Sequence, residues 1–251
     1  PQPQYRRTRA DAITLVRGLF LKRTGNALVC FDFPYGYPQG SKLGGGRNVA
    51  EYLSRLIVDG PDNRNNRFEV AARLNAELND GKAGPFWGCP RNEAGPTLTP
   101  TLRDLGVDRG KFPNYRIVEQ RLRSQKKPIQ SVWKLAYPAS VGSQALLGLP
   151  AIHRLLKDPA LAPHSSVWPF ETDWDARLGG IVHAEIWPSV RDSTNQPFDI
   201  KDARQVAAMR DWALDEDARG TLRHYFARPN PLSDEDERMC RESEGWILGV
   251  E

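Results

Sequence analysis

Three acidic residues occupy positions where an α/β fold would bring them together. Asp32 directly follows the apolar run of residues 27–31, and Glu185 lies within the largely apolar stretch GIVHAEIWPS of residues 180–189. Asp202 lies at the start of the helical pattern that comes next in the chain. An ionised carboxylate at the end of a buried strand costs free energy unless it is paired or binds a cation. Since ligand sites in open α/β sheets lie at the carboxyl ends of strands, these three acids are the candidate site.

Carboxylates gathered at one sheet edge repel one another, and a divalent cation relieves that repulsion. Ligands that are all oxygen atoms favour Mg²⁺ or Mn²⁺ over Zn²⁺. Two such ions can hold the attacking and the leaving oxygen of a phosphodiester. The sequence therefore predicts that Asp32, Glu185 and Asp202 are metal ligands and catalytic residues.

Each acid also has a simpler interpretation, and the sequence leaves these alternatives open. Asp32 could begin the turn at Pro34 or pair with an arginine. Glu185 could be the partner in a buried ion pair. Asp202 could cap its helix. Their order along the chain, at two strand ends and a helix start, is more informative than any one of them.

The elements that would position these acids follow from hydrophobic periodicity and turn residues. Apolar residues at helical spacing predict helices over residues 8–23, 48–58, 66–79, 140–158 and 199–217. The helix at 8–23 has Thr8 and Asp11 at capping spacing, and Asn48 and Glu51 have the same spacing in the second helix. Pro150 is expected to kink or divide the fourth helix. Short runs rich in β-branched and aromatic residues predict strands at 27–33, 165–171 and 180–189.

The composition sets limits on the class of protein. The chain has 251 residues, of which 39% are apolar, with a net charge of +4 and a pI of about 9.0. This balance is compatible with nucleic acid, and the basic run RLRSQKK at 121–127 is either a contact for it or a solvated helix face. No apolar run approaches the roughly 18 residues of a membrane span. Three widely spaced cysteines without a CxxC pair favour a reducing, cytoplasmic setting.

Several motifs resemble those of the predicted-nuclease branch of the RNase H-like superfamily. They are LVCFDFPYGYP, VHAEIWPS and KDARQVAAMRDWA, supported by SVGSQALLGLP, VWPFE and EGWILGV. The resemblance implies a mixed sheet flanked by helices. It assigns residues 1–33 and 165–251 to the RNase H-like core, and residues 34–164 to a mainly helical insertion, or cap. It also places Asp32, Glu185 and Asp202 at the metal-ligand positions.

The same resemblance implies an element that this sequence does not show. RNase H-like folds begin with a β-hairpin whose first strand carries the leading catalytic Asp, and the chain given starts at PQPQYRRTRADA. Either a further segment supplies this strand, or a separate chain supplies it, or the protein has lost it. Without it, the sheet would keep an unpaired edge, and the 251-residue chain would bind Mg²⁺ weakly.

The function that these features predict is metal-dependent phosphodiester hydrolysis on nucleic acid, with Mg²⁺ or Mn²⁺ as cofactor. Lys201 and Arg204, which flank Asp202, are candidate phosphate contacts. One alternative is a non-catalytic binding or scaffold subunit with a degenerate RNase H-like fold. Another is phosphoryl transfer to a small molecule, although the glycine-rich segment 34–47 matches neither a P-loop nor GxGxxG.

Overall fold

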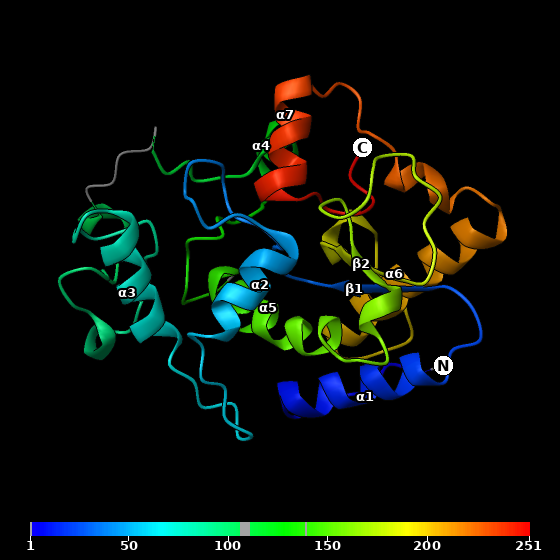
Figure 1. The fold of residues 1–251 in the computed structure, drawn as a ribbon, viewed down its shortest axis with the longest axis horizontal. Coiled ribbons are helices and arrows are strands. Elements are labelled where there is room, and N and C mark those ends of the chain that lie inside the picture. Colours follow the sequence, from blue (N-terminus) through cyan, green and yellow to red (C-terminus); the bar gives the residue numbers. More distant parts are fainter. Residues whose placement is uncertain (1, 106–110, 139) are drawn as a thin grey trace.

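The computed structural model describes residues 2–105, 111–138 and 140–251, which form an α/β fold (Figure 1). Its α-helices are α1 (Arg9–Leu21), α2 (Gly46–Ser54), α3 (Arg67–Leu78), α4 (Ile117–Ser124), α5 (Gly142–Leu156), α6 (Lys201–Ala218) and α7 (Asp234–Met239). Its strands are β1 (Ala27–Phe31), β2 (Ser165–Val167) and β3 (Ile181–Glu185). A π-helical turn, Cys240–Glu244, continues α7. None of the described helices is long and apolar enough to cross a membrane.

The three strands form a small parallel sheet in the order β1-β3-β2. Ala27 lies opposite Ile181 and Phe31 opposite Glu185, so β1 and β3 end at the same edge. The α/β class is therefore confirmed. The mixed sheet is not seen, since the strands in the described part of the chain are all parallel.

Helices α1 and α5 cover one face of this sheet, and every second strand residue points toward them. Ile181 packs there with Phe20 of α1 and Leu155 of α5, and these two helices run side by side across the sheet in Figure 1. Val182 and Ala184 point to the other face. There they meet a cluster that includes Trp168, Trp174 and Trp246.

The segment 34–164 carries α2, α3, α4 and α5, and its described residues include no strand. Its largest cluster joins α2, α3 and α5 around aromatic side chains such as Tyr37 and Trp133. Helix α5 also packs on α1, so part of this segment belongs to the layer that covers the sheet. The division of the chain into an RNase H-like core and a cap stays a prediction.

The capping residues in the sequence predicted one helix start correctly and another wrongly. Thr8 caps α1 as predicted, because its hydroxyl accepts a hydrogen bond from the backbone N–H of Asp11 at 3.1 Å. The cap predicted at Asn48 is wrong: α2 begins two residues earlier, after Gly45, and has no side-chain cap. Helix α5 runs through Pro150 without dividing.

Candidate functional site

The ends of β1 and β3 bring two of the predicted acids to one edge of the sheet. Glu185 is the last residue of β3 and lies opposite Phe31, so Asp32 follows directly beyond that pair. The backbone N–H of Ile186 donates to the carbonyl of Phe31 at 3.0 Å, which holds the two chain segments together just past the strands.

Asp202 reaches the same region from the first turn of α6. The N-cap of this helix is Ile200, and no side chain caps it, so the alternative of Asp202 as the helix cap is wrong. A carboxylate in the first turn is favoured by the helix dipole. The Asp202 carboxylate is exposed and accepts no capping hydrogen bond from the helix backbone. It therefore remains available for a ligand.

The three acids influence one another electrostatically. The Asp32 side chain reaches solvent, but partial desolvation at the strand end, followed by the negative charges of Glu185 and Asp202, raises its pKa to about 6. Lys201 opposes this rise in part. Repulsion between neighbouring carboxylates is one of the environments that a bound cation stabilises.

Glu185 has a partner that the sequence did not reveal. Arg116 binds it with two hydrogen bonds, from Nη2 to Oε1 at 2.5 Å and from Nη1 to Oε2 at 2.7 Å. The backbone N–H of Tyr35 donates to the same Oε2 at 3.0 Å. The arginine is 0% exposed and the glutamate 3% exposed. Glu185 is therefore a buried ion-pair partner, which is one of the two interpretations that the sequence allowed.

Two further glutamates complete a buried polar junction, which we define as Arg116, Glu119, Glu185 and Glu244. Arg116 also bonds Glu119 Oε1 at 3.0 Å and the carbonyl oxygen of Glu244 at 2.7 Å. The Glu244 carboxylate accepts the backbone N–H groups of Gln39 and Ile117 at 2.7 and 2.6 Å. The junction thus ties the strand end to α4 and to the π-helical turn.

The charges within this junction do not balance, because one arginine faces three glutamates. Burial raises the pKa of Glu119 to about 7, although Arg116 partly offsets the rise. Burial also raises the pKa of Glu244. The pKa of Arg116 is raised by Glu185 and Glu119 in spite of its burial, so the arginine stays charged.

The predicted ligand set for a divalent cation is only partly free to bind one. Both oxygens of Glu185 are engaged by Arg116, so this residue does not fit as a ligand in the present arrangement. Within the described ranges, no group of three His, Cys, Asp or Glu side chains is placed to hold a metal ion. Asp32 and Asp202 remain, and Mg²⁺ is commonly bound through one or two carboxylates plus water and substrate phosphate.

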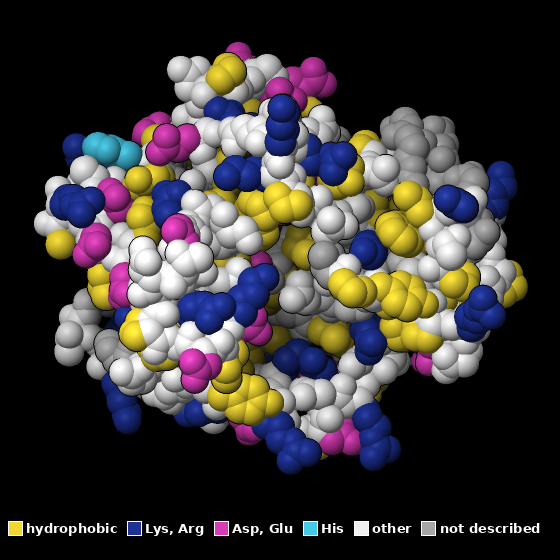
Figure 2. Space-filling view, turned by 180° about the vertical axis from the view of Figure 1, so that it is seen from behind, with side chains coloured by type: hydrophobic (Ala, Val, Ile, Leu, Met, Phe, Trp, Pro, Cys, Tyr) yellow, Lys and Arg dark blue, Asp and Glu magenta, His cyan; other side chains and the backbone are white. Residues whose placement is uncertain are grey.

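The two basic residues near the acids differ in the contacts that their side chains make. Lys201 is exposed and lies close enough to influence Asp32. Arg204 instead donates to the carbonyl oxygens of Phe198 and Asp199 at 2.9 and 3.0 Å, which braces the start of α6. On the face shown in Figure 2, Lys and Arg side chains are spread across the surface and form no continuous stripe.

Several glycines of the glycine-rich segment pack closely against protein. A Cβ at Gly36 would overlap the carbonyl oxygen of Ser243. At Gly46, where φ is +59°, a Cβ would approach the Phe170 ring to 2.7 Å. These glycines allow the loop after β1 to lie directly on the π-helical turn and on Phe170.

Fold and site together define an α/β protein with carboxylates at the ends of parallel strands. Comparison of the chain with models of known families, with characterised proteins and with solved structures gives no match. The RNase H-like resemblance therefore remains a proposal that depends on the motifs themselves.

Proposed function

We propose that this protein catalyses metal-dependent phosphodiester hydrolysis on nucleic acid, on an RNase H-like framework, at Asp32 and Asp202. The observation that carries the proposal is the placement of Asp32 near Glu185 and Asp202: partial burial, and then the negative charges of these two acids, raise the pKa of Asp32 to about 6. A structure that keeps an exposed acid under such repulsion is stabilised when a cation binds there.

The residues take distinct roles in this proposal. Asp32 and Asp202 would hold Mg²⁺ or Mn²⁺, and the ion would supply Lewis-acid polarisation of a phosphate oxygen. Lys201, exposed beside them, binds the phosphate backbone through its charge. Glu185 positions the site, because its pair with Arg116 and its bond to the Tyr35 N–H fix the strand ends.

The open edge of β1 supports the further proposal that an additional strand pairs with β1. β1 pairs with β3 on one side, and no described strand lies on its other side. The Ala27 N–H and the Phe31 carbonyl form hydrogen bonds on the β3 side of β1. Since backbone groups of successive strand residues point to opposite sides, the N–H groups of Leu28 and Cys30 point to the free edge. A segment that added a strand here would bring its own side chains next to Asp32.

We expect hydrogen exchange of the chain alone to report this open edge. The amides of Leu28 and Cys30 should exchange much faster than the amide of Val29, which faces β3, because they lack a strand partner. The measurement is residue-resolved amide exchange by NMR. Equal protection of the three amides would mean that the edge is already covered, and the strand-addition proposal would fail.

A non-catalytic binding or scaffold subunit is the second candidate function. The ion pair between Glu185 and Arg116 favours it, since that pair removes one of the three predicted ligands. This candidate predicts that the protein binds nucleic acid or a protein partner without metal-dependent cleavage.

Replacement of Asp202 by asparagine tests the two candidates. We expect Asp202→Asn to lower Mg²⁺-dependent cleavage of DNA or RNA by roughly ten-fold or more, because one of two carboxylate ligands is lost. Asp215→Asn, an exposed acid near the other end of the same helix, is the matched control and should retain activity. Cleavage is measured with Mg²⁺, Mn²⁺ or EDTA. If the wild-type protein shows no metal-dependent cleavage of either nucleic acid, the scaffold candidate stands instead.

A further inference from the structure

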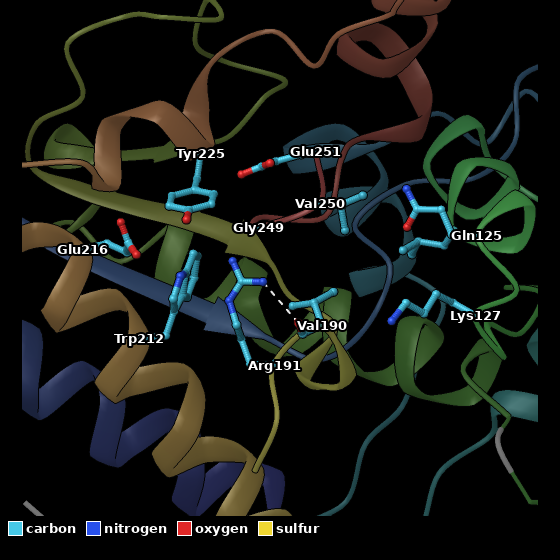
Figure 3. Close-up of a pocket in the computed structure, with 11 residues that line it drawn as sticks. Gln125, Lys127, Val190, Arg191, Trp212, Glu216, Tyr225, Gly249, Val250 and Glu251 are labelled. Carbon is cyan, nitrogen blue, oxygen red and sulfur yellow. Dashed lines mark hydrogen bonds between the residues drawn. The ribbon is translucent and has the colours of Figure 1, made fainter.

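A cavity of about 470 Å³ lies away from the strand-end acids, between α4, α6 and the end of the chain (Figure 3). Arg191, from the segment after β3, and Trp212 and Glu216, from α6, line it together with Tyr225. Gln125 and Lys127, which follow α4, form another part of the wall. Trp212 is ten residues beyond Asp202 on α6, which places it about 15 Å along the helix from that acid.

The Arg191 guanidinium is held by aromatic rings and has no acidic partner. Its central carbon lies 4.5 Å from the centre of the Trp212 ring and 5.6 Å from that of Tyr225. Within the described part of the chain it donates one hydrogen bond, from Nη1 to the carbonyl oxygen of Val190 at 3.1 Å. Among the residues that the structure describes, no carboxylate pairs with Arg191, so most of its donors are unused.

Two other polar side chains of the cavity, Lys127 and Trp212, have no hydrogen-bond partner among the described residues. The Lys127 side chain forms no hydrogen bond or ion pair with the described part of the chain, and the Trp212 Nε1 donor is buried without an acceptor. Glu216 is already engaged, since it accepts the Thr221 hydroxyl at 2.5 Å and lies 3.6 Å from an Arg219 nitrogen. Glu251 lines the cavity too and is exposed.

The backbone is shaped to leave this space open. Gly249 has a φ of +88°, and a Cβ there would lie 3.2 Å from the Trp212 ring and 3.5 Å from Arg191 Nη2. A larger residue would crowd the Trp212 ring on which the arginine stacks, and the positive φ would strain its backbone. The glycine thus preserves the room beside the guanidinium.

We infer that this cavity binds a nucleotide unit, with its phosphate on Arg191 and Lys127 and its base against Trp212 and Tyr225. A planar guanidinium with free N–H groups matches phosphate oxygens, and a lysine adds a point charge. Bases stack on aromatic and arginine side chains without regard to sequence. A volume of about 470 Å³ lies within the range of small-molecule sites. The unit is either a free mononucleotide or one nucleotide of a single strand.

Calorimetric titration without divalent metal tests this inference separately from cleavage. The probes are adenosine and thymidine monophosphate, inorganic phosphate and a short single-stranded oligothymidylate. We expect the monophosphates to bind more tightly than phosphate alone, and Arg191→Met to weaken them about ten-fold or more. Arg154→Met, an exposed arginine on α5, is the control and should bind as the wild type does.

The oligothymidylate identifies the source of the nucleotide unit. Tighter binding than either monophosphate, lost in Arg191→Met, would assign the cavity to a nucleic-acid strand, whereas binding of the monophosphates alone would assign it to free nucleotides. Thermal unfolding shows whether each variant is folded. If Arg191→Met does not fold, nucleotide binding is compared between Lys127→Met and the wild type. Absence of binding to every nucleotide probe, or binding unchanged in both cavity variants, would overturn the inference, whatever the outcome of the cleavage assay.

Discussion

Replacement of Arg116 by methionine will lower the free energy of unfolding by about 3 to 5 kcal/mol, because it leaves buried carboxylates without their counter-charge. The arginine is fully buried and bonds Glu185, Glu119 and the carbonyl of Glu244 at once. Methionine fills similar space but donates no hydrogen bond. The measurement is urea unfolding at neutral pH, followed by circular dichroism.

The matched control makes the same change from arginine to methionine at an exposed position, where no buried carboxylate loses its partner. Arg123→Met, on the helix that Arg116 precedes, removes an exposed arginine whose guanidinium carbon lies 4.3 Å from the centre of the Tyr115 ring, and it should cost about 1 kcal/mol or less. Adding Glu185→Gln to Arg116→Met should recover part of the loss, since one stranded charge disappears. A loss below about 1 kcal/mol in Arg116→Met would show that the junction is not an energetic centre.

Replacement of Asp32 by asparagine is expected to abolish most metal-dependent cleavage. Lewis-acid assistance contributes several kcal/mol, and each 1.4 kcal/mol is a factor of ten, so we expect a loss of at least about 100-fold. The fold should not weaken, because Asp32→Asn removes a charge that Glu185 and Asp202 repel. Initial cleavage rates with Mg²⁺ and thermal unfolding of the same samples measure both effects.

The control for this variant is Asp199→Asn, an exposed acid just before α6 whose contribution to the fold is its backbone carbonyl. It should cleave at the wild-type rate. Equal cleavage by the Asp32→Asn and wild-type proteins would remove Asp32 from the mechanism and, with it, the proposed site.

Local patterns in the sequence were sufficient to locate the strands and the acids that follow them. The predicted strands at 27–33 and 180–189 contain β1 and β3 but extend beyond their ends, and the parallel register places Phe31 opposite Glu185. Periodicity likewise located α1 and α3 to within one or two residues. These features depend on neighbouring residues, which a pattern in the chain can report.

The partners of the acids could not be predicted in the same way. Arg116 is 69 residues from Glu185, and Glu244 is 128 residues from Arg116, so no spacing connects them. The one local hint was Glu119, three residues after Arg116, which bonds back to the Arg116 N–H at 2.9 Å in the manner of a capping box. Only the tertiary fold shows that one arginine neutralises Glu185 and leaves Asp32 and Asp202 as the available carboxylates.

NMR titration of the Asp32 carboxyl carbon, with and without Mg²⁺, is the most direct test of whether Asp32 binds a divalent cation. The folded-state pKa of about 6 lies above the ordinary aspartate value of 3.8, so protons compete with a cation below about pH 6. We expect a titration near pH 6 without metal, and a clear shift to lower pH when Mg²⁺ is added, since a bound cation favours the charged form. Titration near pH 4 without metal, or a midpoint that Mg²⁺ leaves unchanged, would contradict it.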